Sequence, residues 1–82
     1  MVYEVFYENE ATKDLNKLDA SVSRRIIKKI DEMSISPSSC DIKKLKSSKY
    51  YRLRVGDYRI IFTFENNIIK ILKIGNRQNI YR

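Results

Sequence analysis

Arginines concentrate in a short stretch of the chain that has the pattern of a β-hairpin. Arg52 and Arg54 precede the pair Gly56-Asp57, and Arg59 follows it. Planar guanidinium groups hold phosphate oxygens through pairs of hydrogen bonds and remain charged at any working pH. Arginines that converge on one face of such a hairpin would therefore form a pocket for a phosphodiester.

The turn determines which of these arginines face each other. Gly56-Asp57 suits the positive φ angles of a tight hairpin turn, and successive side chains of a strand point to opposite faces. Arg54 then lies opposite Arg59, where two like charges cost about 0.2–1 kcal/mol. We expect an anion between them, and an ion pair with an acidic residue from the first half of the chain is the alternative. The other face is apolar and is predicted to be the core face, with Val55 opposite Tyr58, Leu53 opposite Ile60, and Tyr51 opposite Phe62.

A third strand, predicted over Ile68–Ile74, brings another arginine towards this pair. Asn66-Asn67 has the composition of a second tight turn. Continuing the register through it sets the last residue of the third strand, Ile74, opposite Arg59. Gly75 then permits a bend, so that Arg77 is expected beside the other two arginines.

Two tyrosines are candidates for stacking a base beside this phosphate pocket, as aromatic side chains do in proteins that bind single-stranded RNA. They are Tyr50, at the start of the hairpin, and Tyr81, which lies close to Arg77 in the sequence. For any single tyrosine on a strand, packing is the commoner role.

The chain is strongly basic in its second half only. Its 82 residues suffice for one domain, 1–82, and its net charge is +7. Residues 43–82 hold eleven basic and two acidic side chains, a net charge of +9. Such an excess attracts nucleic acid, an acidic protein segment or an anionic membrane surface, and a solubilising surface is the alternative. Four lysines of one loop are candidate RNA contacts: Lys43, Lys44, Lys46 and Lys49.

Other kinds of chemistry have little support in the composition. The chain has no histidine and a single cysteine, Cys40, so an internal disulfide, a thiolate cluster for a metal and the usual base for a cysteine nucleophile are all missing. We expect neither a metal site nor a cofactor. No apolar run approaches the roughly 20 residues that span a bilayer, so a cytoplasmic protein without a membrane segment is expected.

Hydrophobic periodicity predicts the elements that position these residues. Val2–Tyr7 is rich in β-branched and aromatic residues and predicts a first strand. Asn9 is a candidate cap for a first helix, and Asp19 or Ser21 for a second. The second helix has a stripe of apolar residues at helical spacing, and Ser34–Ser39, which contains Pro37, ends it.

Together with the hairpin strands Tyr50–Val55 and Tyr58–Glu65 and the third strand, these elements predict an α+β fold. The order is β-α-α-β-β-β, with a lysine-rich loop over residues 35–49. Two antiparallel N-terminal helices are expected to pack on one face of a mostly antiparallel, twisted sheet.

Several of these residues resemble the motifs of one known family. Lys44-Leu45-Lys46, the stretch Tyr51–Phe62 (YRLRVGDYRIIF), Ile74–Arg77 (IGNR) and Tyr81-Arg82 are similar to segments of RelE/ParE-superfamily toxins. The resemblance runs nearly end to end, and each motif has its place in the β-α-α-β-β-β order. It implies the RelE-like fold and the toxin of a type II toxin–antitoxin system.

For the RelE branch, the resemblance implies a metal-independent endoribonuclease that cleaves messenger RNA on the ribosome and so inhibits translation. The ribose 2′-OH would attack the adjacent phosphodiester. A cognate acidic antitoxin, RelB-like, would wrap the toxin and hold it inactive. Operator DNA would be bound only through the toxin–antitoxin complex.

The resemblance also implies roles for individual residues. Arg59 would hold the phosphate, Arg77 would stabilise charge and protonate the leaving oxygen, and Tyr81 would stack or orient the RNA. Arginine hardly loses its proton, so the base is left open among Tyr81, a loop lysine such as Lys46, and a ribosomal group. Asn76 stands where relatives often have histidine. The implied catalytic set is Arg54, Arg59, Arg77 and Tyr81, and the implied RNA-binding set is Arg52, Arg82 and the four loop lysines.

Two other functions are compatible with the sequence. For the ParE branch, the resemblance implies a toxin without enzymatic activity that inhibits DNA gyrase. The basic half alone is compatible with a nucleic-acid-binding module that has no activity. New messenger 5′ ends within translated codons would indicate the first function, inhibited supercoiling the second, and salt-dependent binding without cleavage the third.

Overall fold

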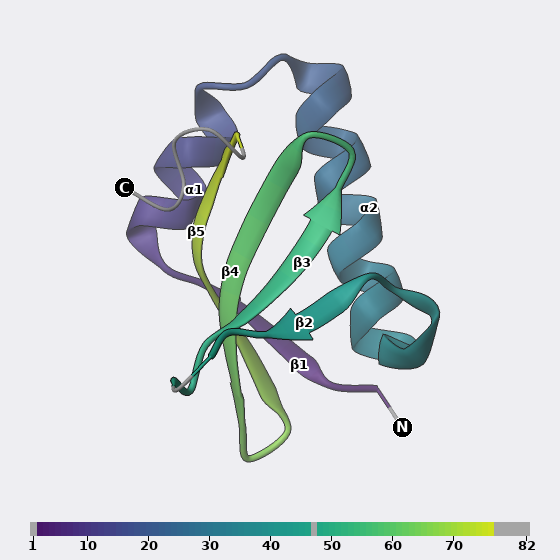
Figure 1. Cartoon of the computed structure of the whole chain (residues 1–82). Coiled ribbons are helices and arrows are strands. Elements are labelled where there is room, and N and C mark those ends of the chain that lie inside the picture. The colour runs from purple at the N-terminus through teal and green to yellow at the C-terminus, as the bar shows by residue number, and fades with distance from the viewer. Residues whose placement is uncertain (1, 47, 77–82) are drawn as a thin grey trace.

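Five strands form one twisted sheet in the order β1-β5-β4-β3-β2 (Figure 1). The computed structural model describes residues 2–46 and 48–76. At one edge, β1 (Glu4–Tyr7) runs parallel to β5 (Ile68–Asn76). The other pairs are antiparallel: β5 with β4 (Tyr58–Glu65), β4 with β3 (Tyr51–Val55), and β3 with β2 (Ile42–Lys44) at the opposite edge. The mostly antiparallel sheet predicted from the sequence is confirmed.

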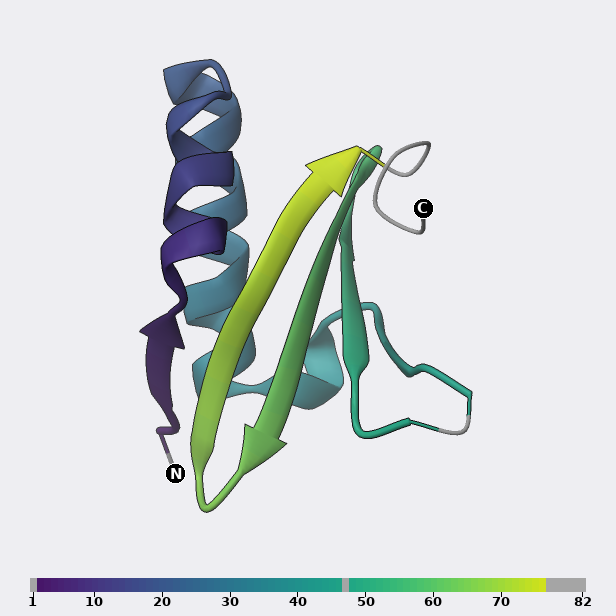
Figure 2. The same cartoon turned by 90° about the vertical axis from the view of Figure 1, so that its left-hand side faces the viewer.

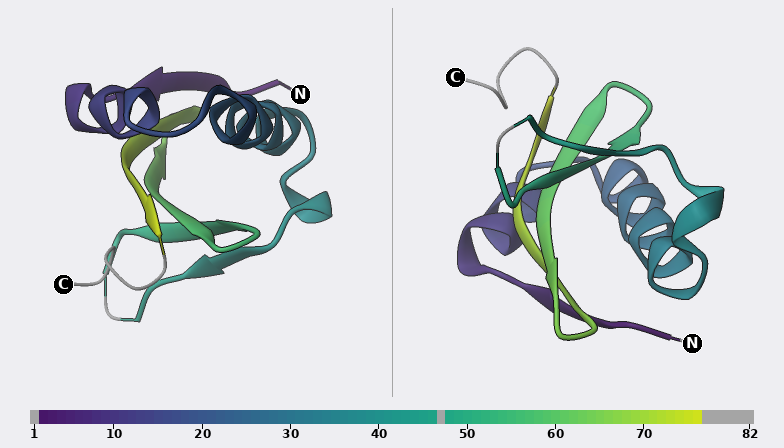
Figure 3. Two further views of the ribbon diagram at one scale, coloured as in Figure 1. Left: turned by 90° about the horizontal axis from the view of Figure 1, so that it is seen from above. Right: turned by 60° about the horizontal axis from the view of Figure 1, so that its bottom comes forward.

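Two antiparallel helices cover one face of this sheet (Figures 2 and 3). α1 (Asn9–Asn16) follows β1, and α2 (Ala20–Ile35) follows α1 after a short link. α2 ends just before the 3₁₀ turn η1 (Pro37–Ser39), since proline lacks a backbone donor and its ring obstructs a continuing helix. The α+β class and its helix placement are thus confirmed. Over residues 2–46 and 48–76, neither helix has the length and apolar character needed to span a bilayer.

The sheet face beneath the helices forms the core. α2 contributes Ile26, Ile30 and Met33, which are at most 1% exposed and repeat at helical spacing. Tyr51 stacks on Phe62 with 5.5 Å between the ring centroids, as expected for the predicted core face of the hairpin. The buried residues of the strands are Leu53, Val55, Ile60, Phe62, Ile69, Ile71 and Ile74.

Asp14 of α1 completes the hydrogen bonding of β5. The pairing of β1 with β5 ends at Tyr7 and Ile71, so the backbone donors further along β5 have no strand beside them on that edge. The Ile74 N–H instead donates to Asp14 Oδ2 at 2.9 Å. A side chain from the helix layer therefore holds the last part of β5.

The ends of the first elements differ from the prediction. β1 begins at Glu4 rather than Val2, whose side chain is 69% exposed. Glu8, not Asn9, is the cap residue of α1, because Glu8 still has extended backbone angles and Asn9 is already helical. Asp19 occupies the predicted capping position of α2, but its side chain makes no capping hydrogen bond. The helices are held mainly by their apolar faces, as is usual for short helices in proteins.

The sequence predicts a loop over residues 35–49, but the structure has a strand within it. β2 contains two lysines and one partly buried apolar residue, Ile42, which lies opposite Leu53. Three residues are too few to show the two-residue alternation by which a strand is recognised. β2 forms because its backbone can pair with the edge of β3.

A bulge changes the predicted register between β4 and β5. Asn66 and Asn67 form the expected tight turn, with φ angles of 53° and 64°. The pairing then shifts by one residue near the middle of the two strands, so that Gly75 rather than Ile74 lies opposite Arg59. Gly75 is also part of the strand and not of a bend. The prediction was wrong here because a bulge adds one residue to one strand and displaces every later pair.

Candidate functional site

The sheet face turned away from the helices, called the outer face below, carries most of the basic side chains of the described strands. Side chains alternate along each strand, so the neighbours of core residues lie on this face. Arg54 lies opposite Arg59, as predicted, and Arg52 lies opposite Ile61 in the next row. The basic residues at outer-face positions are Lys43 on β2, Arg52 and Arg54 on β3, Arg59 on β4, and Lys70 and Lys73 on β5.

An acidic side chain just before β2 contacts two of these arginines. Asp41 Oδ2 lies 2.6 Å from Arg54 Nε, and Asp41 Oδ1 lies 3.5 Å from Arg52 Nη2. The backbone N–H of Arg54 donates to the carbonyl oxygen of Asp41 at 3.0 Å, which fixes the two residues opposite each other. Arg54 therefore forms an ion pair with an acidic residue from the first half of the chain, which was the alternative to a bound anion in the sequence analysis. Its counter-charge is a carboxylate of the protein.

The contact with Asp41 satisfies only some of the hydrogen-bond donors of Arg52. Its side chain is 18% exposed, and its Nε is buried without a hydrogen-bond partner in the described part of the chain. The 3.5 Å contact to Asp41 is longer than the about 2.7–2.9 Å of a strong charge-assisted hydrogen bond. The Arg52 guanidinium thus retains donors that a further acceptor could use.

Arg59 is buried, with 7% of its surface exposed. Its Nη1 donates to the carbonyl oxygens of Gly56 and Tyr58, each at 3.1 Å. Arg25 of α2 reaches the same turn, since a Cβ atom added at Gly56 would lie 3.2 Å from Arg25 Nη2. Neutral carbonyls, and no carboxylate of residues 2–46 and 48–76, accept from Arg59. Its positive charge is therefore not neutralised by an ion pair there.

Lys73 belongs to the outer face and was not among the candidates from the sequence. It lies opposite Ile61, in the same row as Arg52. The uninterrupted register predicted from the turn would have paired Leu72 with Ile61 and turned Lys73 towards the core. The apolar pair Ile71-Leu72, which breaks the alternation of β5, is the sequence signal that could have revealed the bulge and this lysine.

The four loop lysines are all exposed but do not share one surface. Lys43 lies on the outer face opposite Arg52, whereas Lys44 occupies the position opposite Tyr51, on the other face. Lys46 lies in the turn after β2. Lys49 contacts the neighbouring tyrosine.

That tyrosine is Tyr50, one of the two predicted stacking residues. Lys49 Nζ lies 5.8 Å from the centroid of its ring. Tyr50 is four residues before Arg54, or roughly 13 Å along an extended chain. Acidic side chains are present at this end, where Glu8 Oε1 lies 3.7 Å from Lys70 Nζ. Glu8, Lys49, Tyr50, Thr63, Glu65, Lys70 and Leu72 line a hollow of about 210 Å³.

Three residues assigned to the site by the sequence lie outside the described residues. They are Arg77, Tyr81 and Arg82, and their roles stay predictions. The last described residue of β5, Asn76, lies opposite Tyr58, beside the Gly56-Asp57 turn. This is the end of the outer face at which the arginines are concentrated.

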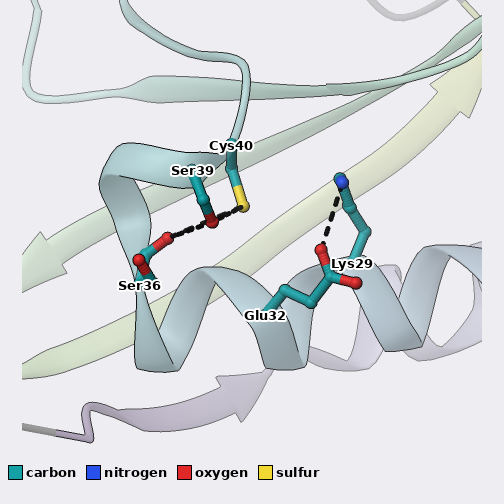
Figure 4. Close-up of polar contacts among 5 residues, drawn as sticks. All are labelled: Lys29, Glu32, Ser36, Ser39 and Cys40. Carbon is teal, nitrogen blue, oxygen red and sulfur yellow. Dashed lines mark hydrogen bonds and ion pairs between the residues drawn. The ribbon is translucent and has the colours of Figure 1, made fainter.

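Cys40 directly precedes Asp41, and Figure 4 shows the polar groups around its side chain. Its sulfur is 3.8 Å from the Ser39 hydroxyl and 4.0 Å from the carbonyl oxygen of Ser36. Lys29 donates to the Glu32 carboxylate at 3.1 Å, and this hydrogen bond raises the pKa of Lys29. A lysine held in its charged form is a poor base, so these contacts offer the thiol no general base. Within the described residues, no three side chains of the metal-ligating types Asp, Glu, Cys or His form a metal-binding group.

The surroundings of Tyr7 shift the pKa of its hydroxyl group. Burial, reinforced by the negative charge of Asp31, raises the pKa of Tyr7 to about 12. Tyr7 pairs with the core residue Ile71 and so lies on the face beneath the helices. The raised pKa of Tyr7 results from its packing against the core, and Tyr7 is not part of the outer face.

Comparison with known proteins identifies the class to which this chain belongs. A family model described as "ParE toxin of type II toxin-antitoxin system, parDE" matches residues 5–81. Toxin RelE3 of Methanocaldococcus jannaschii is 32% identical over 83 residues, covering 95% of this chain and 94% of that protein. The chain belongs to the RelE/ParE superfamily of toxins from type II toxin–antitoxin systems.

Solved structures are similar over almost the whole chain. A chain of the archaeal RelE–RelB complex from Pyrococcus horikoshii OT3 has a TM-score of 0.80 and 31% identity, covering 96% of this chain and 99% of that one. The RelB–RelE antitoxin–toxin complex from Methanococcus jannaschii gives a TM-score of 0.77 and 32% identity, covering 93% and 94%. Within the superfamily, these similarities are to the RelE toxins. The RelE-like fold expected from the sequence is confirmed.

Proposed function

We propose that this toxin is a ribosome-dependent endoribonuclease that cleaves messenger RNA in the cytoplasm and thereby inhibits translation. The observation that carries the proposal is the set of arginines on two adjacent strands at one end of the outer face. Arg54 lies opposite Arg59, and the guanidinium groups of Arg52 and Arg54 both contact Asp41. The 32% identity to a protein named as a RelE toxin supports the RelE branch.

The proposed reaction needs charge stabilisation and orientation. The ribose 2′-oxygen forms a bond to phosphorus while the bond from phosphorus to the 5′-oxygen breaks, which yields a 2′,3′-cyclic phosphate and a 5′-hydroxyl. The pentavalent phosphorane carries additional negative charge, and fixed guanidinium groups stabilise it more than they stabilise the substrate. A rigid sheet that orients the RNA for in-line attack lowers the entropy cost of reaching the transition state.

The arginines differ in how they can serve this reaction. Arg54 has a side chain that is 52% exposed and is the most accessible of the three to a phosphate. Arg59 is buried and uses Nη1 for two carbonyls of its own turn, so it serves mainly as a fixed positive charge beneath the site. Lys43 and Lys73, one row further along the outer face, suit adjacent phosphates of the same strand.

None of these arginines is assigned as the base, because a guanidinium keeps its proton at any working pH. We assign charge stabilisation and protonation of the leaving 5′-oxygen, which as an alkoxide is more basic than a guanidine, to Arg77, and RNA stacking to Tyr81. The acceptor of the 2′ proton is Tyr81, Lys46 or a ribosomal group. Tyr81→Phe, which keeps the ring for stacking and removes only the hydroxyl, and Lys46→Gln distinguish these three, since neither variant loses cleavage if the ribosome supplies the base.

A cognate acidic antitoxin is the proposed partner that holds the toxin inactive. Two similar solved structures are complexes of RelE with RelB. The positive outer face suits an acidic chain that orders on binding. On the helix side, a wholly apolar groove of about 130 Å³ between α2, η1 and the sheet, lined in part by Tyr3, Met33 and Phe64, suits apolar side chains of the same partner.

Growth arrest combined with mapping of messenger 5′ ends tests the enzymatic function. Expression of the wild type should arrest growth and produce new 5′ ends within translated codons. Arg54→Gln should reduce cleavage on purified translating ribosomes by about 10²–10³-fold, the usual cost of one donor to a developing oxyanion. Lys28→Gln, which removes an exposed positive charge on α2, is the matched control and should cleave normally.

Folding must be monitored for the buried arginine. Arg59→Gln removes a side chain that is 7% exposed, so its melting temperature is measured alongside its activity. If Arg54→Gln and the double variant Arg54→Gln/Arg59→Gln remain folded and cleave as the wild type does, the role assigned to these arginines is wrong. If the wild type itself produces no new 5′ ends on translating ribosomes, the proposed function is wrong.

A second candidate function is inhibition of DNA gyrase without RNA cleavage. The match of a ParE family model to residues 5–81 is the observation that favours it. Purified toxin added to a gyrase supercoiling reaction separates the two functions. Inhibited supercoiling with intact messenger RNA would favour the ParE activity, and cleaved messenger RNA with normal supercoiling would favour the RelE activity.

A further inference from the structure

Asp41 binds the arginine cluster with the geometry of an anionic ligand. Its two carboxylate oxygens contact different arginines, Oδ2 with Arg54 at 2.6 Å and Oδ1 with Arg52 at 3.5 Å. Two non-bridging oxygens of a phosphodiester can bridge two guanidinium groups in the same way. The carboxylate therefore occupies a position between the arginines at which a phosphate would be bound.

The carboxylate does not saturate the site. Arg52 Nε is buried and has no hydrogen-bond partner in the described part of the chain. Buried donors are almost always satisfied, and an exception calls for an explanation such as an absent ligand. A phosphate group offers more acceptor oxygens than a carboxylate, so it can use both the donors that bind Asp41 and donors that Asp41 leaves unused.

Displacing the Asp41 carboxylate from the arginines costs little free energy. The side chains of Asp41 and Arg54 are 43% and 52% exposed, and ion pairs at such exposure contribute only about 0.2–1 kcal/mol. The Asp41 backbone is held independently, because its carbonyl oxygen accepts the Arg54 N–H. The carboxylate can rotate into solvent while the strand pairing is kept.

From these three observations, we propose that Asp41 is an internal phosphate mimic. Its carboxylate occupies the phosphate position between Arg52 and Arg54, and single-stranded RNA binds by displacing it. The proposal rests on the phosphate-binding role of the outer face given above. It adds that the toxin carries its own competitor for RNA, which lowers the affinity of the isolated protein for RNA away from the ribosome.

Removing the competitor should tighten RNA binding. We would measure binding of a fluorescent single-stranded RNA oligonucleotide by anisotropy, without ribosomes, over a series of salt concentrations. The range of exposed ion-pair energies corresponds to about 1.4- to 5-fold in affinity, and the two-armed contact of Asp41 favours the upper part, about 3- to 5-fold, for Asp41→Asn. The slope of log affinity against log salt should steepen by about 0.7 for each arginine released to a phosphate.

Asp57→Asn is the matched control. Asp57 is an exposed acid in the β3–β4 turn, and its substitution removes the same charge without breaking an ion pair among the described residues. It should tighten RNA binding less than Asp41→Asn does. Combining Asp41→Asn with Arg54→Gln should abolish the extra affinity, because the arginine that the carboxylate competes for is then missing.

The possible outcomes separate this proposal from the proposed function. If Asp41→Asn binds RNA no more tightly than Asp57→Asn, or more weakly, the carboxylate positions the arginines rather than competing for them, and the proposal is overturned. The same conclusion follows if neither the wild type nor Asp41→Asn binds the oligonucleotide at low salt. RNA binding that tightens as expected in a protein that never arrests growth would instead contradict only the proposed enzymatic function.

Discussion

Substituting Asp14 with alanine tests how the last part of β5 is held. The change removes the acceptor of the Ile74 N–H, 2.9 Å away, beyond the point where β1 pairs with β5. A partly buried donor left without a partner costs about 1–3 kcal/mol, and the higher helix propensity of alanine returns up to about 0.7 kcal/mol. We expect the free energy of unfolding to fall by roughly 0.3–3 kcal/mol, and each kcal/mol lost lowers the melting temperature by roughly 4–8 °C.

Urea denaturation followed by circular dichroism measures this loss, and hydrogen exchange of the Ile74 amide locates it. Asp14→Asn keeps an acceptor oxygen and should lose less stability than Asp14→Ala. Asn16→Ala, at the exposed end of α1, gains helix propensity without losing that hydrogen bond and should be neutral or stabilising. An Asp14→Ala variant as stable as Asn16→Ala, with the Ile74 amide still protected, would refute the reasoning.

Three further outcomes can be measured on the isolated protein or in cells. The pKa of Tyr7 is about 12 in the folded chain and near 10 when unfolded. Its contribution to the free energy of unfolding is therefore fully present below pH 10 and is lost as the pH rises from 10 through 12. The loss is about 1–2 kcal/mol after discounting for partial exposure, and Tyr7→Phe should flatten this part of a denaturation series. Gly56 has a φ of +58°, so Gly56→Ala should cost about 1–2 kcal/mol and Gly56→Asn less in the same assay. Cys40→Ala should leave growth arrest unchanged, and loss of arrest by the folded variant would reveal a role for the thiol.

The helices and the hairpin could be predicted because their apolar residues repeat over a sufficient length. Ile26, Ile30 and Met33 mark one face of α2, and two strands with alternating side chains flank Gly56. β2 could not be predicted, because Ile42 is the only apolar residue of a three-residue strand whose existence depends on its partner. The bulge in β5 could not be predicted for a related reason. Apolar residues lie on both faces of this strand, so the sequence does not show at which residue the alternation changes.

The candidate site was predictable in its register but not in its contacts. The turn places Arg54 opposite Arg59, and the structure agrees. It does not indicate where the guanidinium groups point, because Asp41 reaches Arg54 only through the unpredicted strand that follows it. The burial of Arg59 against the carbonyls of its own turn likewise depends on three-dimensional packing. Charge and spacing indicate a surface, whereas side-chain partners require the fold.

The parallel pair formed by β1 and β5 bears on how the toxin is made. Glu4 lies opposite Ile68, so β1 finds its partner only after another 64 residues (68 − 4) have been synthesised. At about 5–20 residues per second, that delay is roughly 3–13 s. Contacts between such distant residues also slow folding, because the intervening chain must close before they form. A nascent chain interrupted before Ile68 carries the arginine hairpin but no closed core, and we expect it to be degraded as unfolded polypeptide.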